Sequence, residues 1–307
     1  MTIATLTLNP ALDVTTCTEK VTPNHKLRCT TPRFDPGGGG INVARVVTHL
    51  GGDAVAVFPC GGPAGAMIVE LLETQHIPIL PVQIAGATRE SFTVDEGRPG
   101  DQYRFVLPGP ELREEEQAKL LDALFGVEDV SHIVVSGSLP PGCDPAIVQR
   151  IGARCHAAGV KLVLDTSGAA LAACEDSRAW LIKPSLREAA DLLDREITSE
   201  DDEMAAAREL QRRGFAEIVV ISLAERGALL VSQDEEFRMP AIPVEAKGTV
   251  GAGDSMVAAI TLAASLGKGI RNALHYGIAA GAATLMTPAT ELASREDVER
   301  LYAGSTS

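Results

Sequence analysis

Short apolar runs alternate along this chain with longer segments that carry the residue spacing of amphipathic helices. The pattern predicts strands at residues 3–8, 133–135, 160–164, 218–221 and 228–231, and helices at 145–158, 201–214, 251–266 and 270–284. Such alternation is typical of a mainly parallel sheet with helices on both faces. We therefore expect an α/β fold whose ligands bind in loops at the carboxyl ends of the strands.

Two stretches interrupt this alternation. Residues 13–34 and 89–107 are strand-like and more polar, with turns at residues 23–24 and 97–100. Two β-rich insertions in an α/β chain indicate a small separate sheet, although a pair of ordinary surface hairpins would give the same pattern. A small sheet leaves strand edges and faces that need covering, which favours pairing with a second copy.

Charge and composition exclude several classes of protein. The formal net charge of −14 argues against nucleic acid or an anionic membrane surface as a partner. Apolar runs are too short to span a bilayer, and the start of the chain is strand-like rather than a signal peptide. Six scattered cysteines without a CxxC pair favour reduced thiols. We expect a cytoplasmic globular protein.

A glycine-rich segment at residues 248–256 ends on one aspartate, Asp254, and runs directly into a predicted helix. Glycine allows close backbone approach, and the free N–H groups of a helix N-terminus favour an anion such as a transferring phosphoryl group. Asp254 would then be placed to accept a proton from an attacking hydroxyl. The alternative is a glycine-rich turn in which Asp254 is merely the helix N-cap.

Other familiar catalytic motifs are missing from the sequence. It contains no GxxxxGK[ST], HExxH or GxSxG segment, and residues 37–42 do not complete GxGxxG. Without a P-loop lysine, phosphate charge would be neutralised by helix N-termini, Mg²⁺ and arginines. Cations gather in the N-terminal third, where we expect most of them to be solvated surface charges: Lys26, Arg28, Arg33, Arg45, Arg89 and Arg104.

Residues 248–256 resemble the C-terminal signature of the PfkB (ribokinase-like) family of sugar kinases, and residues 36–45 resemble its N-terminal signature. Similarity extends from Thr5 to about Tyr302. The resemblance implies a ribokinase-like three-layer core with a mainly parallel sheet, in a single kinase domain over residues 1–307. It also implies a β lid over the sugar, built from about 13–34 and 89–107, through which two copies form a homodimer.

The family's site residues can be carried over by position. Asp254 corresponds to the catalytic base, and Gly251, Ala252 and Gly253 to the anion hole. Arg89 corresponds to the arginine that binds the phosphate already on the sugar, with Arg104 and Lys26 as weaker candidates. Contacts to the sugar itself are implied for Asp13, Gly38, Gly39, Asn42 and Ser138. The plainer alternatives are a turn former at Asp13, a helix N-cap at Asn42 and turn chemistry at Ser138.

Nucleotide contacts are implied for Ser185, Arg187, Ser222, Ala224, Gly227 and Thr249. Glu188 would organise Mg²⁺ through water, and the carbonyls of Gly248 and Val250 could hold K⁺. The sequence departs from the family where Ser185 replaces an asparagine and Ala224 a common glycine. Thr287, Ala289 and Glu291 also replace the usual residue types, so we expect weak potassium activation.

The resemblance therefore implies ATP-dependent phosphorylation of fructose 6-phosphate to fructose 1,6-bisphosphate. The uninterrupted run of four glycines at residues 37–40 favours this substrate over fructose 1-phosphate. Kinases of tagatose 6-phosphate and of fructose 1-phosphate stay open as alternatives, because the signatures do not fix the sugar. A sugar-phosphate-binding protein with little kinase activity is the alternative from a different class.

Overall fold

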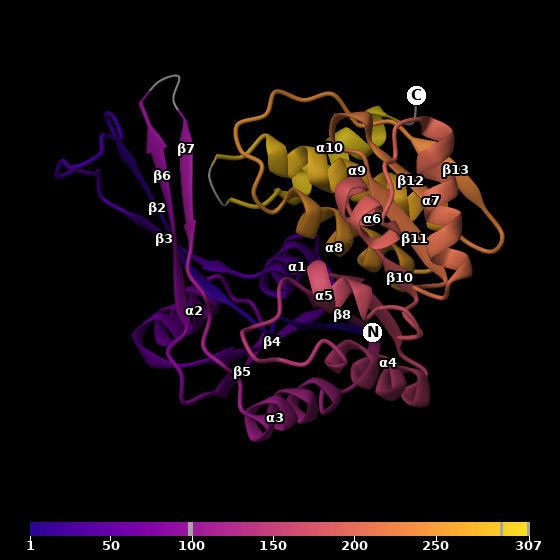
Figure 1. The fold of residues 1–307 in the computed structure, drawn as a ribbon, viewed down its shortest axis with the longest axis horizontal. Helices are drawn as coiled ribbons and strands as arrows, with labels where there is room; N and C mark the ends of the chain where they lie inside the picture. The colour runs from indigo at the N-terminus through magenta and orange to yellow at the C-terminus, as the bar shows by residue number, and fades with distance from the viewer. Residues whose placement is uncertain (98–100, 289–290, 306–307) are drawn as a thin grey trace.

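The larger of two sheets has nine strands in the order β13-β12-β11-β10-β9-β8-β1-β4-β5 in the computed structural model, which describes residues 1–97, 101–288 and 291–305 (Figure 1). Neighbours from β5 to β11 are parallel, and β12 and β13 join antiparallel at one edge. The predicted mainly parallel sheet is confirmed. The strand bounds are β1 Thr2–Leu6, β4 Ala54–Cys60, β5 Ile79–Gln83, β8 Val130–Ser136, β9 Lys161–Asp165, β10 Leu181–Ile182, β11 Ile218–Ser222, β12 Ala228–Val231 and β13 Glu236–Met239.

Helices cover both faces of this sheet and bury two apolar cores. One core contains residues of α1 Gly39–His49, α2 Gly62–Thr74, α8 Ala252–Ser265, α9 Ile270–Leu285 and α10 Arg295–Gly304. The other contains residues of α3 Glu114–Phe125, α4 Ile147–Ala158, α5 Gly168–Ala172, α6 Leu186–Leu193 and α7 Glu200–Arg212. Strand side chains alternate between them: Val134 faces the first core, and Ile133 and Val135 face the second. The result is the expected three-layer α/β architecture.

A second sheet, called the lid here, has the order β3-β2-β6-β7 and projects from the core (Figure 1). Its strands are β2 Ala11–Thr18, β3 Arg33–Gly37, β6 Arg89–Glu96 and β7 Gln102–Val106. Because β2 pairs with β6 in parallel, both β-rich stretches contribute to one sheet. The alternative of two separate surface hairpins was therefore wrong.

The carboxyl ends of the parallel strands meet the N-termini of two helices. Ser136, Asp165 and Ser222 are the last residues of β8, β9 and β11, and α1 and α8 begin at Gly39 and Ala252. The chain leaves the main sheet after Leu6, earlier than predicted, to enter the lid at Ala11. Polar groups from segments far apart in sequence therefore lie at one edge of the sheet, as expected for parallel strands.

The structure also bears on the expectations about membrane-spanning segments and cysteines. Among the residues that the structure describes, no helix is long and apolar enough to cross a bilayer. All six cysteines are free thiols, and four of them are buried: Cys60, Cys143, Cys155 and Cys174.

Candidate active site

Asp254 lies in the first turn of α8, which begins at the glycine-rich loop. Gly251 is the N-cap, with a left-handed φ of 80° that favours glycine, so the alternative of Asp254 as N-cap was wrong. Backbone N–H groups in this first turn have no acceptor within the helix, and Gly253 is exposed. The N-terminus of α8 therefore offers the positive end of a helix beside one carboxylate.

Two side chains from other elements hold the Asp254 carboxylate. Nδ2 of Asn42 donates to Oδ2 (2.9 Å), and Oγ of Ser136 donates to Oδ1 (3.4 Å). Asn42 is the fourth residue of α1, whose N-cap is Gly38, so its alternative role as an N-cap was wrong. Burial and the nearby charge of Asp165 raise the pKa of Asp254 to about 7, against the opposing effects of Asn42 and Lys183. A carboxylate with this pKa can accept a proton near neutral pH.

A buried ion pair lies beside Asp254. Nζ of Lys183 is 3.1 Å from Oδ1 of Asp165, and the lysine is only 7% exposed. Burial disfavours the charge of Lys183, but the carboxylates around it, Asp165 first, raise its pKa overall. A Cβ built on Gly253 would lie 3.5 Å from Nζ, so this cation reaches the start of α8.

Sequence reasoning missed Lys183, Asp165 and Ser136. Each is a single polar residue at or just after the end of a buried strand, which is where ligands meet a parallel sheet. That position is the one signal in the sequence for these three residues, and it does not indicate which of them face one another.

The four-glycine run brings the lid, the main sheet and α1 into close contact. A Cβ on Gly37 would lie 2.2 Å from Oδ2 of Asp13, and one on Gly39 would lie 2.1 Å from Oγ of Ser136. Real Cβ atoms do not approach other atoms this closely, so side chains at both positions would displace the polar groups. The run therefore places Asp13 and Ser136 around the start of α1.

The root of the lid is the end of this sheet at which Ala11 of β2 is paired with both Gly37 of β3 and Arg89 of β6. Asp13 lies two residues from Ala11 on the same strand. Burial raises the pKa of Asp13 to about 6, although the charges of Arg104 and Arg89 oppose it. Nη1 and Nη2 of Arg89 donate to the carbonyls of Leu107 (3.1 Å) and Asn9 (3.0 Å). Within the described residues, its buried Nε has no hydrogen-bond partner, which leaves a donor for an anion.

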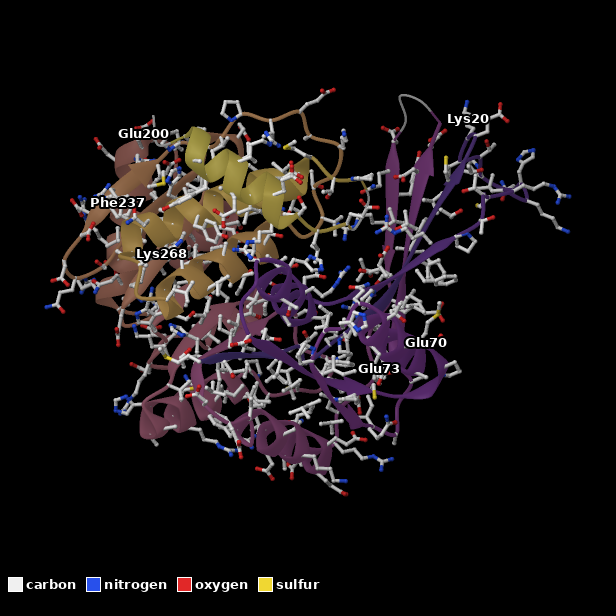
Figure 2. All side chains as sticks on the ribbon, turned by 180° about the vertical axis from the view of Figure 1, so that it is seen from behind. Lys20, Glu70, Glu73, Glu200, Phe237 and Lys268 are labelled. Atoms are coloured by element: carbon white, nitrogen blue, oxygen red, sulfur yellow. The ribbon has the colours of Figure 1, made fainter. Side chains whose placement is uncertain are left out.

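The remaining sugar-side candidates differ in position. Oγ of Ser138 accepts a hydrogen bond from Nδ2 of Asn9 (3.2 Å), so Ser138 lies close to the lid root. Arg104 is an exposed residue of β7 whose charge acts on Asp13. Figure 2 shows Lys20, just after β2, at the outer end of the lid. Lys26 is exposed in the same connection between β2 and β3, and Oγ1 of Thr18, at the end of β2 opposite Ala11, donates to the carbonyl of nearby Arg28 (3.2 Å). Within one chain, Lys26 therefore lies away from the lid root.

The nucleotide-side candidates other than Thr249 lie in two adjacent loops. Ser185 and Glu188 make a capping box at the start of α6, and Oε2 of Glu188 accepts from both N and Oγ of Ser185 (2.8 Å each). Ser185 forms an isolated parallel β-bridge with Ser222, and the backbone N–H of Ser222 donates to the carbonyl of Pro184 (3.1 Å). Arg187 is exposed. The two loops are thus joined at the ends of β10 and β11.

The loop after β11 explains why glycine would suit position 224. Ala224 has a φ of 53°, in the left-handed region where a Cβ is unfavourable. Gly227 has a φ of 93°, and a Cβ there would lie 2.1 Å from the carbonyl oxygen of Met239. Position 227 therefore requires glycine, whereas position 224 tolerates alanine under strain.

Gly248, Thr249 and Val250 lie in the loop that leads into α8, where Gly248 N donates to the carbonyl of Leu285 (3.3 Å). Oγ1 of Thr287, just after α9, lies within hydrogen-bonding distance of the carbonyls of Thr284 (2.8 Å) and Glu291 (2.6 Å) and can donate to either. Glu291 also pairs with Arg33 of the lid at 2.7 Å, a contact that sequence reasoning missed. Ala289 lies outside the described residues.

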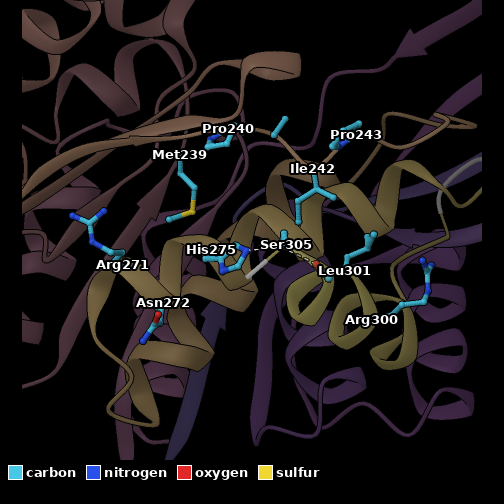
Figure 3. A pocket seen from close by; sticks show the side chains of 12 residues that line it. Met239, Pro240, Ile242, Pro243, Arg271, Asn272, His275, Arg300, Leu301 and Ser305 are labelled. Carbon is cyan, nitrogen blue, oxygen red and sulfur yellow. Dashed lines mark hydrogen bonds between the residues drawn. The ribbon is translucent and has the colours of Figure 1, made fainter. Parts of the chain in front are cut away.

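A cavity of about 690 Å³ lies elsewhere, between the segment after β13 and the helices α9 and α10 (Figure 3). None of the site residues predicted from the sequence lines it. Its basic side chains already have partners: Arg271 pairs with Glu235 and Arg300 with Asp297, and His275 is hydrogen-bonded to Ser305. The cavity is therefore a weaker candidate for an anionic substrate than the start of α8.

Known proteins resemble this chain over nearly its whole length. The model of the pfkB family of carbohydrate kinases matches residues 7–296. The ATP-dependent 6-phosphofructokinase isozyme 2 of Mycobacterium tuberculosis is 48% identical over 301 residues, covering 98% of this chain and 88% of the relative. Phosphofructokinase-2 from Escherichia coli in complex with substrates and products is 40% identical, with a TM-score of 0.95 and complete coverage of both chains. The same enzyme in complex with potassium also has a TM-score of 0.95 at 40% identity, covering 99% of each chain. The chain therefore belongs to the pfkB family of carbohydrate kinases.

Proposed function

We propose that this protein transfers the γ-phosphoryl group of ATP to fructose 6-phosphate and so forms fructose 1,6-bisphosphate. The observation that carries the proposal is the carboxylate of Asp254 at the uncapped N-terminus of α8, hydrogen-bonded to Asn42 at 2.9 Å. The 48% identity to a 6-phosphofructokinase over nearly the full chain supports the same substrate.

In the proposed reaction, Asp254 accepts the proton of the attacking sugar hydroxyl. The hydroxyl oxygen bonds to the γ-phosphorus, the bond from that phosphorus to the bridging oxygen breaks, and ADP leaves with the electron pair. N–H groups at the start of α8, together with the Lys183 ammonium, stabilise the charge on the transferring group. The pKa of about 7 leaves a substantial fraction of Asp254 ionised at neutral pH.

The lid root would bind the sugar phosphate. Arg89 is assigned to the phosphate already on the sugar, supported by its unpartnered buried Nε. Asp13, Asn42, Ser138 and the backbone of Gly38 and Gly39 would contact the sugar. A closed lid would exclude water and limit wasteful ATP hydrolysis.

Mg²⁺ and K⁺ are proposed on different grounds. Mg²⁺ is usually held by one or two carboxylates together with substrate phosphates. Glu188 offers such a carboxylate, because hydrogen bonds from Ser185 orient it near Asp165, which is paired with Lys183. Among the described residues, no group of three or more acidic, cysteine or histidine side chains could hold a metal alone, which fits a metal that arrives with ATP. When bound, Mg²⁺ would neutralise charge on the ATP phosphates. The potassium complex of the Escherichia coli enzyme supports K⁺ binding by this chain. We assign the ion to the carbonyls of Gly248 and Val250 from the resemblance of this loop to the family signature.

We also propose one kinase domain over residues 1–307, with a lid from about 13–34 and 89–107 that pairs with the lid of a second copy. Exposed apolar side chains on lid strands β6 and β7 and just after them support this homodimer: Phe92, Phe105, Val106 and Leu107. Burying such a patch favours association.

The direct test measures ADP release with fructose 6-phosphate, tagatose 6-phosphate, fructose 1-phosphate, fructose and ribose, and identifies the products. We expect the highest kcat/KM with fructose 6-phosphate. A higher value with tagatose 6-phosphate or fructose 1-phosphate would assign the alternative sugar. Binding of fructose 6-phosphate without ADP release from any sugar would instead favour a binding protein.

A further inference from the structure

Arg45, in α1, is a buried cation at the edge of the candidate active site. Only 5% of its surface is exposed, so groups inside the protein must satisfy its donors. Nε donates to Oε1 of Gln75 (2.9 Å), and Nη1 donates to the carbonyl of Pro36 (3.4 Å) and to Oδ1 of Asn42 (3.2 Å). The expectation of a solvated surface charge was therefore wrong for this residue.

The hydrogen bond from Arg45 to Asn42 determines which way the Asn42 side-chain amide faces. One end of the amide, Oδ1, accepts from Arg45, and the other end, Nδ2, donates to Oδ2 of Asp254. If the amide were rotated by half a turn, its NH₂ group would face the guanidinium donor and its oxygen would face the Asp254 carboxylate. Both contacts would be repulsive, because a guanidinium only donates hydrogen bonds and an ionised carboxylate only accepts them.

We propose that Arg45 is a positioning residue for phosphoryl transfer, which holds the Asn42 amide in the orientation that donates to Asp254. The inference rests on the proposed role of Asp254 as the base. Without Arg45, the amide could turn, and the carboxylate would lose the donor that fixes its direction. Arg45 would then affect kcat without touching either substrate.

A double-mutant cycle on kcat separates this role from a purely structural one. We expect Arg45→Met to lower kcat roughly tenfold, because the amide orientation is lost. In an Asn42→Ala background, the same change should lower kcat less than about threefold further, since no amide remains to be oriented. The loss of thermal stability caused by Arg45→Met should be similar in both backgrounds. Gln75→Leu removes a different partner of Arg45 and is the matched control, with kcat expected within about twofold of the wild type.

Equal factors in the two backgrounds would overturn the proposal, as would a wild-type kcat in every Arg45 variant that folds. Arg45→Lys and Arg45→Gln replace the methionine variant in the cycle if that variant does not fold. Asp254→Asn separates the proposed role of Arg45 from the proposed role of Asp254 as the base. If Asp254→Asn abolishes turnover but Arg45→Met lowers kcat by the same factor with and without Asn42, only the role of Arg45 fails. If Asp254→Asn keeps wild-type turnover, the proposed function of the site fails first.

Discussion

Nδ2 of Asn42 lies 2.9 Å from Oδ2 of Asp254, although 212 positions separate the two residues in sequence. The contact joins the N-terminal turns of α1 and α8, which pack against each other on one face of the sheet. Each turn follows its own glycine-rich segment. The two most informative stretches of the sequence therefore meet at one carboxylate.

The first prediction concerns Asp254 as the base. Asp254→Asn should lower kcat by about 10²-fold or more, because the amide cannot accept the proton, and should change KM little. The wild-type kcat should fall as the pH drops below about 7, since the carboxylate becomes protonated. Steady-state kinetics between pH 5.5 and 8.5 measure both effects. Asp234→Asn, at an exposed turn before β13, is the control. A variant at position 254 that keeps most of the wild-type kcat would contradict the assignment.

The second prediction concerns stability. The pKa of Asp254 in the folded protein, about 7, lies above its ordinary value of 3.8, so the folded state binds the proton more tightly. The stability contributed by this group is therefore complete below about pH 4 and is lost as the pH rises through 7. Asparagine does not titrate. The melting temperature of Asp254→Asn relative to the wild type should rise by roughly a few degrees between pH 5 and pH 8. A difference that stays constant over this range would rule out the raised pKa.

The fold and the centre of the site could be predicted because their signals are local. The β/α alternation indicated the main sheet, and the two glycine-rich segments pointed to Asp254 and Asn42. Lys183 and Asp165 could not be recognised in this way, because their roles depend on β9 and β10 lying side by side. The burial of Arg45 likewise follows from the packing of α1 against the root of the lid. Three-dimensional proximity decides these roles.

The third prediction uses the strained alanine after β11. Ala224→Gly should raise the free energy of unfolding by about 0.5–1 kcal/mol, because glycine adopts the φ of 53° without a Cβ penalty. The same change at Ala153, an exposed position inside α4, should lower it by about 0.5–1 kcal/mol. Urea denaturation of the two variants measures both signs. If Ala224→Gly destabilises the protein as much as Ala153→Gly does, the strain at position 224 is not real.

The fourth prediction concerns the homodimer. Phe105 is 53% exposed on β7 of the lid, and Phe105→Glu would place a charge within the proposed interface. The wild type should sediment as a dimer at micromolar concentration, and the variant should shift toward the monomer. Leu266→Glu is the matched control, because Leu266 is 68% exposed at the C-terminal end of α8, outside the lid. A wild type that is monomeric and fully active, or a variant that remains dimeric, would contradict pairing through the lid.

The last prediction tests the phosphate assigned to Arg89. Its guanidinium is held by the carbonyls of Leu107 and Asn9, so it presents a fixed charge at the lid root. Losing a charge-assisted contact costs on the order of 1.5–3 kcal/mol, so Arg89→Met should lower kcat/KM for fructose 6-phosphate roughly ten- to a hundredfold. Activity with unphosphorylated fructose should change much less, because that sugar has no phosphate to lose. Arg300→Met, at an exposed position of α10, is the control and should leave kcat/KM unchanged for both substrates. Equal losses with fructose 6-phosphate and fructose would show that Arg89 supports the lid and does not bind the sugar phosphate.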